Sequence, residues 1–350
     1  MRSTAIVLAA GEGTRMKSKL PKVAHRILGV PLVEYVVDAA RAAEIDRVVV
    51  VTGHGAGTVE SLLDGVEYAR QNEQLGTGHA VMCALEVTGP LDGPVIVLAG
   101  DVPLIRPETI ARLVEAQAAT GAGCVLLTAD FYDPTGYGRI VRDADGAVIG
   151  IVEHKDLAPD QLGIRECNVG VYCFDGAALG TYLAELRTDN AQGEYYLTDL
   201  VKLLRAAGRD VESVLSDDVD ESRGVNSRVQ LAEVTRALQR RINERHMVAG
   251  VTMTDPGLVW IGPHVTLGAD VVLEPMTFLF GETTVAEDCT IGPDSRVTDS
   301  TVGRGSVVDS SIVEGATLGE GVRVGPRAEV APGSVLGDGA TVGTGTVPCR

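Results

Sequence analysis

The sequence lacks the features that mark several large classes of protein. Its six cysteines are scattered, with no Cys-x-x-Cys pair and no cysteine–histidine cluster. This pattern favours neither a zinc site nor a disulfide framework and is typical of a reducing compartment. No apolar run approaches the roughly 20 residues that a membrane-spanning helix needs, and the first residues do not resemble a secretory signal. We therefore expect a cytoplasmic protein with no membrane partner.

Positive charge is also scarce. Lys and Arg number 30 against 48 Asp and Glu, which gives a formal net charge of −18 and argues against nucleic acid as a partner. Aromatic residues make up only 4%, whereas glycine is abundant, at 42 of 350 residues. Against this acidic background, the cluster of lysines and arginine from Arg15 to Lys22 stands out as a local basic segment.

Residues 1–226 alternate strand and helix patterns. The runs TAIVLAA, DRVVVVTG, GPVIVLAGD and GCVLLTAD are typical of buried parallel strands, and PETIARLVEAQAATG has Pro107 at a plausible helix start. This is the pattern of an α/β domain, in which sites gather at the carboxyl ends of strands, here Leu8–Gly11 and Ala99–Asp101. After Tyr132, turn-rich strands such as GRIVRD and NVGVYCFD predict a lid or insertion.

Residues 227–249 predict one connecting helix, and its apolar stripe is formed by Val229, Leu231, Val234, Leu238 and Ile242. Over residues 250–350 aliphatic residues recur every six positions, a period that is typical of a parallel β-helix of hexapeptide repeats. The spacing slips to five through Val302, Val307 and Ile312 and returns to six at Leu318. We expect each of these aliphatic side chains to point inward.

The segment LAAGEGTRMKSKLPK, residues 8–22, follows the first strand. It contains neither the GxGxxG fingerprint nor a P-loop. It nevertheless combines bare backbone N–H groups with a guanidinium and several ammonium groups, which together suit phosphate. A basic turn that is merely solvated is the alternative. The excess of positive charge in an acidic protein favours a phosphate ligand.

The longer stretch LAAGEGTRMKSKLPKVAHRILGVPLVEYV resembles the N-terminal signature of sugar-1-phosphate nucleotidylyltransferases. It is most similar to the bifunctional N-acetylglucosamine-1-phosphate uridylyltransferase/glucosamine-1-phosphate acetyltransferase family. QNEQLGTGHAV, GDVPL, DPTGYGRI, GIVEHKD, NAQGEYYLTD and GVNSR match that family in order, so the resemblance covers residues 1–226. It implies a Rossmann-like nucleotidyltransferase domain of residues 1–226, a connecting helix of residues 227–249 and a truncated left-handed β-helix of residues 250–350.

The resemblance also implies roles for individual residues. Arg15 and Lys22 are the expected catalytic contacts to the triphosphate, and Asp101 and Asn226 the expected ligands of Mg²⁺. The nucleotide would lie against Leu8, Ala9, Ala10, Gly11, Gly13, Gln71, Gly76 and Thr77. The sugar phosphate would lie against Ala99, Gly100, Asp101, Gly138, Glu153, Asn168 and Asn226, with Lys155 as a less certain neighbour.

These assignments have simpler alternatives. Asp101 and Asn226 could each cap a turn or a helix, and His79, near the expected base site, is expected to cap or pack. Ala99 departs from the family pattern, in which a polar or aromatic residue is expected before the Gly-Asp pair. Its backbone would still serve.

The implied reaction is UTP plus N-acetylglucosamine 1-phosphate giving UDP-N-acetylglucosamine and pyrophosphate, in a homotrimer formed through the β-helix. Alternatives are a nucleotidylyltransferase for another sugar 1-phosphate such as glucose 1-phosphate, a non-catalytic regulatory protein of this architecture, or a plain β-helix acyltransferase.

We expect no acetyltransferase activity. Ala331 stands where the family places the second arginine of a GPFARLRPG-like stretch, and the chain stops at Arg350. Residues 251–350 carry five arginines, no lysine and thirteen carboxylates, which is a poor field for the phosphates of acetyl-CoA. The last hundred residues are therefore expected to be an oligomerisation stalk, unless the chain is a fragment of a longer protein.

Overall fold

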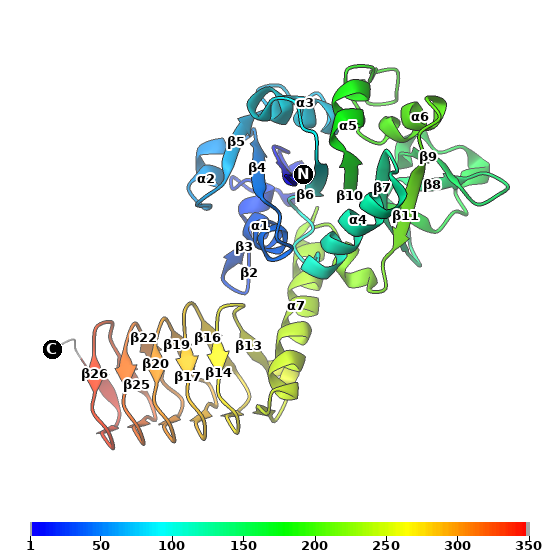
Figure 1. Ribbon diagram of the computed structural model, residues 1–350. Coiled ribbons are helices and arrows are strands. Elements are labelled where there is room, and N and C mark those ends of the chain that lie inside the picture. Colours follow the sequence, from blue (N-terminus) through cyan, green and yellow to red (C-terminus); the bar gives the residue numbers. More distant parts are fainter. Residues whose placement is uncertain (1, 348–350) are drawn as a thin grey trace. The chain divides into compact units, whose positions relative to one another are not determined.

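The computed structural model describes residues 2–347 and divides the chain into two compact units (Figure 1). The first unit consists of the residues up to His25 together with Pro31–Leu231. The second consists of Arg26–Val30 together with the residues from Ala232 onward. Each unit has its own strands, so the two are described separately.

The first unit contains a nine-stranded mixed sheet with the main strand order β11-β7-β10-β6-β1-β4-β5, and the short strands β8 and β9 extend it beside β10. Strands β1, β4 and β6 are parallel to one another, as predicted, and β5, which was not predicted, adds a further parallel strand beside β4. The bounds are β1 Thr4–Ala9, β4 Arg47–Thr52, β5 Glu67–Arg70, β6 Pro94–Ala99, β7 Cys124–Asp130, β8 Arg139–Arg142, β9 Val148–Val152, β10 Glu166–Asp175 and β11 Val211–Leu215.

Helices cover both faces of this sheet (Figure 1). Along β1, Ala5 and Val7 pack with the helices of one face and Ile6 with those of the other, and all three are fully buried. Burial on both faces explains why the strands are continuous apolar runs rather than alternating ones. On the first face lie α1 Leu32–Ala42, α2 Ala56–Glu60 and α4 Pro107–Thr120; on the second lie α3 Thr77–Thr88, α5 Gly176–Leu183 and α6 Asp199–Ala206.

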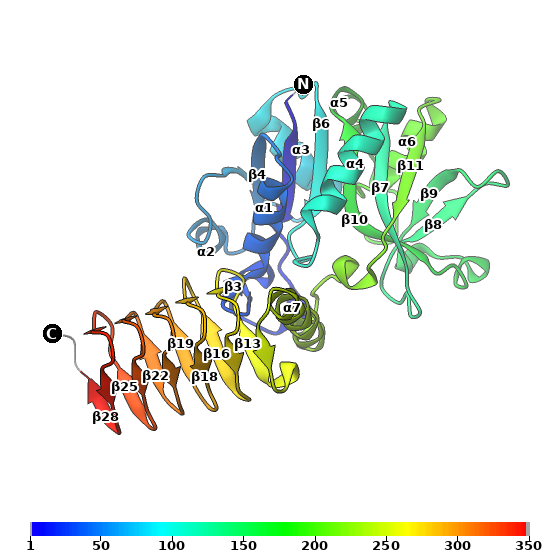
Figure 2. The same ribbon diagram turned by 60° about the horizontal axis from the view of Figure 1, so that its bottom comes forward.

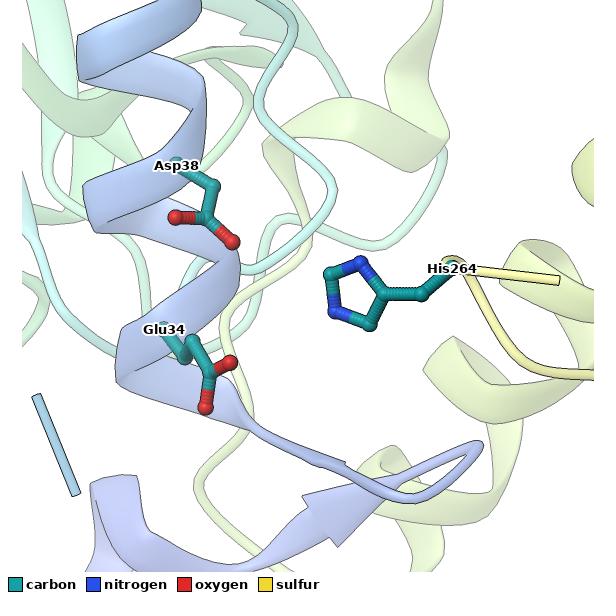
Figure 3. Close-up of side chains that lie close together, drawn as sticks. All are labelled: Glu34, Asp38 and His264. Atoms are coloured by element: carbon teal, nitrogen blue, oxygen red, sulfur yellow. The ribbon is translucent and has the colours of Figure 1, made fainter. Parts of the chain in front are cut away.

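Helix α1 illustrates how the pattern of the sequence selects the buried side. Val33, Val36 and Val37 are fully buried against the sheet. Glu34 and Asp38, one turn apart, project from another side of the helix (Figure 3). Figure 3 also draws His264, an exposed residue of the second unit.

The prediction of a lid in NVGVYCFD was wrong. These residues form most of β10, which is antiparallel to both β6 and β7 and lies between them. β7 therefore runs in the same direction as β6 but is separated from it by β10, and its parallel partner in the sheet is β11. The strand resembled a turn because Gly170 has a φ of 80° and the register shifts between Asn168 and Tyr172. GRIVRD contributes β8, which forms a hairpin with β9.

The predicted connecting helix is α7, Arg228–Val248. Val234, Leu238 and Ile242 of the predicted stripe are buried, but Val229 is 68% exposed. Ala237 and His246 are buried as well, and so are two amides: the side chains of Gln239 and Asn243 donate to the Val259 carbonyl at 2.6 and 2.9 Å. They satisfy the buried backbone carbonyl of Val259, which lies in the first coil of the β-helix, a function that hydropathy patterns do not reveal.

The second unit is a left-handed parallel β-helix with three faces, each a parallel sheet, whose coils stack one after another (Figures 1 and 2). Arg26–Val30 belongs to the same unit, and there β2 Arg26–Ile27 pairs with β3 Val30–Pro31. The first face contains β12 Thr252–Met253, β15 Val272–Leu273, β18 Thr290–Ile291, β21 Val307–Val308, β24 Arg323–Val324 and β27 Thr341–Val342. The second contains β13 Val259–Ile261, β16 Thr277–Phe280, β19 Arg296–Thr298, β22 Ile312–Glu314, β25 Ala328–Val330 and β28 Gly345–Val347. The third contains β14 Thr266–Leu267, β17 Thr284–Val285, β20 Thr301–Val302, β23 Thr317–Leu318 and β26 Val335–Leu336.

For two of the residues predicted to point into this β-helix, the prediction was wrong. Val308, and not Val307, stacks on Ile291 and is fully buried. In the next sheet Val313 is fully buried, whereas Ile312 is 47% exposed. The sequence is ambiguous here because each position is one of two adjacent aliphatic residues. Where the repeat loses a residue, only the register of the neighbouring coil selects between them.

Two expectations about composition concern the whole chain. The five described cysteines are all buried and free, and Cys349 lies outside the described residues, as does Arg350. Among the helices of residues 2–347, none combines the length and the apolar character that a membrane crossing requires.

Candidate functional site

A cleft with a volume of about 270 Å³ opens at the carboxyl ends of β1, β5 and β6. Leu8 and Gly11 line it after β1, Gln71 after β5, and Ala99 and Asp101 after β6. This is the edge of a parallel sheet at which α/β folds bind ligands. The cleft also brings in Ala10, Lys22, Gly76 and Thr77, so most residues predicted for the nucleotide line one cavity.

Close backbone packing shapes the wall of the cleft beside β1. Gly13 has a φ of 64°, and a β-carbon there would lie 2.5 Å from Cβ of Lys22. Gly100 donates its N–H to the Leu8 carbonyl at 3.0 Å, and a β-carbon on it would lie 2.8 Å from that oxygen. Only glycine fits either position without displacing its neighbour. Met16, fully buried, anchors the short turn that follows.

At one end of the cleft, the ammonium group of Lys22 lies between two side-chain oxygen atoms. The Nζ of Lys22 lies 2.5 Å from Oδ2 of Asp101 and 3.1 Å from Oδ1 of Asn226. The side chains of Lys22 and Asp101 are only 16% and 15% exposed. The Asp101 carbonyl also accepts from the N–H of Val225, which ties the segment before Asn226 to the end of β6.

The same oxygen pair suits a divalent metal ion. A carboxylate and an amide oxygen are ligands that Mg²⁺ prefers, and Mg²⁺ completes its shell with water or substrate phosphates. The Lys22 ammonium stands in for such a cation, because both oxygens already converge on one positive charge. Asp101 and Asn226 therefore fit a magnesium site.

The capping alternative for Asn226 does not hold. Ser227 Oγ accepts from the N–H of Gln230 at 3.2 Å, and Gln230 Oε1 accepts from the N–H of Asn226 at 2.9 Å. These two bonds cap the start of α7 much as a capping box does, except that Gln230 accepts from the residue before Ser227. The side chain of Asn226 therefore remains directed at Lys22.

The other end of the cleft presents an amide and a helix terminus. Gln71 is 3% exposed, and its Nε2 donates to the Gly76 carbonyl at 2.9 Å. Within the described residues its Oε1 accepts no hydrogen bond. Gly76 precedes α3 with a φ of 104°, and a β-carbon there would lie 2.7 Å from the Tyr195 carbonyl. The residue before α3 therefore has no side chain that could cover the backbone at the start of this helix.

Three predicted sugar-binding residues lie together elsewhere in the first unit. The N–H of Asn168 donates to the Gly138 carbonyl at 2.9 Å, and a β-carbon on Gly138 would lie 3.5 Å from both carboxylate oxygens of Glu153. Glu153 lines a cavity of about 140 Å³ and accepts from the Thr198 hydroxyl at 3.2 Å. Burial raises the pKa of Glu153, and nearby carboxylates add to that shift.

Three predicted residues neither line the two cavities nor take part in the contacts described above. Arg15 is exposed on the turn Thr14–Met16 and forms no ion pair with the described residues. Ala9 is 1% exposed and packs in the core on the α1 side of the sheet. Lys155 is exposed and donates to Oε1 of Gln192 at 2.5 Å.

The predicted set omitted two polar residues that line the cleft and one that supports it. Gln74 donates its Nε2 to the Ala10 carbonyl at 2.9 Å, and Glu194 lines the cavity near Gly76. His79 lies behind Gln71, with Nδ1 at 3.1 Å from its Nε2. All three lie within the matching motifs QNEQLGTGHAV and NAQGEYYLTD, but nothing in those strings indicates which letters face the ligand.

Comparison with known proteins shows which family the chain belongs to. The MobA-like NTP transferase domain family matches residues 5–157. The bifunctional protein GlmU of Exiguobacterium sibiricum is 46% identical over 308 residues, 88% of this chain and 69% of the relative. The chain belongs to the GlmU family. GlmU of Caldanaerobacter subterraneus subsp. tengcongensis is 50% identical over 301 residues, 86% of this chain and 65% of the relative. GlmU of Lactobacillus delbrueckii subsp. bulgaricus is 48% identical over 306 residues, 87% and 66%. The chain thus spans about two thirds of the length of these GlmU relatives.

Proposed function

We propose that this protein transfers the uridylyl group of UTP to N-acetylglucosamine 1-phosphate, releasing pyrophosphate and UDP-N-acetylglucosamine in the cytoplasm. The observation that carries the proposal is a single cleft, in a member of the GlmU family, with the Gln71 amide at one end and the Lys22 ammonium between two oxygens at the other.

The amide end suits uracil. The pairing edge of uracil presents one N–H donor between two carbonyl acceptors. Oε1 of Gln71 is an acceptor, and the N–H groups at Gly76 and Thr77, where α3 begins, are donors. The ribose and triphosphate then extend along the backbone of Leu8–Gly11 toward Lys22.

The cationic end suits the reacting phosphates. A phosphate oxygen of the sugar phosphate attacks the α-phosphorus of UTP, and the bond from that phosphorus to the bridging oxygen breaks as pyrophosphate leaves. The attacking group is already an anion, so positioning and neutralisation of charge carry the rate. Lys22 contributes one charge inside the cleft, and we assign Arg15, on its exposed turn, to the outer phosphates.

Asp101 and Asn226 would hold Mg²⁺. The ion would supply positive charge beside the phosphate oxygens. The Lys22 ammonium would then turn from these two oxygens to the triphosphate.

We assign the sugar phosphate to the group of Gly138, Glu153 and Asn168, with the backbone of Ala99 and Gly100 beside the α-phosphate. The Glu153 carboxylate is an acceptor for sugar hydroxyls. A β-carbon on Gly170 of the β10 bulge would lie 3.7 Å from Cβ of Ala99, so this group adjoins the cleft.

For the second unit we propose side-by-side association into a homotrimer and no acetyl transfer. The acidic composition of residues 251–350 and Ala331 support the latter. The assay offers acetyl-CoA and glucosamine 1-phosphate and follows free thiol. Thiol release that depends on the amino sugar would refute this part of the proposal.

The test of the main proposal is a substrate panel with pyrophosphate as the readout. We expect release that requires a divalent metal, UTP and N-acetylglucosamine 1-phosphate. No release from that pair, or a clear preference for glucose 1-phosphate, would contradict it.

A further inference from the structure

The side chain of Gln71 is held from two sides. Its Nε2 carries two hydrogens: one points to the Gly76 carbonyl at 2.9 Å and the other to Nδ1 of His79 at 3.1 Å. The Gly76 contact identifies the nitrogen end of the amide, because a carbonyl oxygen only accepts. With both hydrogens engaged, Oε1 is the end that faces the cleft.

The surroundings of His79 fix where its ring lies. Its Nε2 is 3.8 Å from Sγ of Cys83, one turn further along α3, and its ring centroid is 6.5 Å from that of Tyr195. Nδ1 also lies 3.1 Å from the Glu73 carbonyl. A ring proton on Nδ1 would donate to that carbonyl and leave one buried hydrogen of Gln71 without an acceptor. A proton on Nε2 leaves Nδ1 free to accept from Gln71, and water can serve Glu73, which is exposed.

We propose that His79 is a positioning residue that determines the base specificity of the cleft. By accepting from Gln71, it adds to the Gly76 carbonyl in disfavouring rotation of the amide and so helps to keep an acceptor, rather than a donor, at the base. The inference rests on the proposed use of this cleft for a nucleoside triphosphate.

The chemistry of the bases gives the direction of the effect. N3 of uracil carries a hydrogen and can donate to Oε1 of Gln71. N3 of cytosine is an acceptor and would meet that oxygen lone pair to lone pair. An amide rotated by half a turn would present Nε2 and would suit cytosine instead. His79 therefore favours UTP over CTP by disfavouring the rotated amide.

The experiment compares UTP with CTP in four proteins: wild type, His79→Phe, His79→Asn and Cys83→Ala. Phenylalanine keeps a ring beside Tyr195 but removes the acceptor. The amide oxygen of asparagine can stand close to the position of Nδ1. Cys83→Ala removes the sulfur atom that lies beside Nε2 of the ring and leaves Nδ1 unchanged.

We expect His79→Phe to lower the UTP-to-CTP ratio of kcat/KM roughly tenfold, the value of about one hydrogen bond. The change should appear mainly in the KM for UTP, with kcat little altered. His79→Asn should restore most of the ratio, and Cys83→Ala should keep it. An unchanged ratio in His79→Phe, or an equal loss in His79→Asn, would overturn the inference.

A binding measurement separates this inference from the proposed function. The dissociation constants of UTP and CTP, measured by titration calorimetry for the same proteins, should show the same change of ratio without any turnover. If the wild type binds UTP but releases no pyrophosphate, the proposed reaction fails while a changed ratio still supports the role of His79. Equal ratios in the wild type and His79→Phe overturn that role whatever the turnover.

Discussion

Replacing Lys22 with methionine should tighten the binding of metal to the nucleotide-free protein while it lowers turnover. The ammonium of Lys22 occupies the position between Asp101 and Asn226 to which a divalent ion would bind, at 2.5 and 3.1 Å from their oxygens. A metal must therefore displace it. Methionine keeps a similar chain length but has no charge and no N–H donor, so the two oxygens become available.

The size of the effect follows from the contacts that the metal must break. The ion pair of Lys22 and Asp101 is largely shielded, with 16% and 15% of the side chains exposed. A hydrogen bond to a charged group contributes about 1.5–3 kcal/mol, and each 1.4 kcal/mol is about a factor of ten in affinity. We therefore expect the dissociation constant for the metal to fall roughly 10- to 100-fold in Lys22→Met.

The assay titrates nucleotide-free protein with Mn²⁺, follows the free ion by electron paramagnetic resonance, and then displaces it with Mg²⁺. Lys19→Met, an exposed lysine of the same segment, is the matched control and should bind metal like the wild type. Equal or weaker metal binding in Lys22→Met would show that the ammonium does not occupy the metal position. Turnover should fall in the same variant, because Lys22 no longer neutralises the phosphates.

Three further predictions concern the metal ligands, the sugar site and the second unit. Asp101→Ala should abolish turnover with an unchanged circular dichroism spectrum, and Asn226→Ala should raise the magnesium requirement; wild-type kinetics in either would remove the metal from this position. Burial raises the pKa of Glu153, so the KM for the sugar phosphate should rise as the pH falls through that pKa, and Glu153→Gln should lose this dependence. Because the pKa is higher folded than unfolded, ionisation destabilises the fold, and Glu153→Gln should raise the melting temperature at neutral pH but not in acid. Sedimentation at micromolar concentration should give the mass of a trimer, and a monomer mass would refute the association.

Features of the fold that repeat along the chain could be predicted from the sequence. The six-residue period places Ile291 and Val297 inside the β-helix, where both are fully buried. The choice between Val307 and Val308 could not be predicted, because it depends on pairing with the previous coil. The place of strand β10 in the main sheet was missed for a similar reason: its bulge near Gly170 interrupts the apolar pattern, and only pairing with β6 and β7 shows where it belongs.

The residues of the candidate site also divide into those that could be predicted from the sequence and those that could not. The ends of β1 and β6 predicted Leu8 and Asp101, because strand ends are visible in the sequence. Residues that act through contacts with distant parts of the chain were harder to predict from the sequence. Asn226 lies 204 positions from Lys22, and no spacing rule links them. His79 could be found only once its distance to Gln71 was known.

The central claim is tested most directly by following the α-phosphate of UTP. With α-labelled UTP, N-acetylglucosamine 1-phosphate and Mg²⁺, we predict that the label enters UDP-N-acetylglucosamine, with one pyrophosphate released for each labelled product. Label that stays in UTP, or that enters UDP-glucose from glucose 1-phosphate more efficiently, would contradict the account.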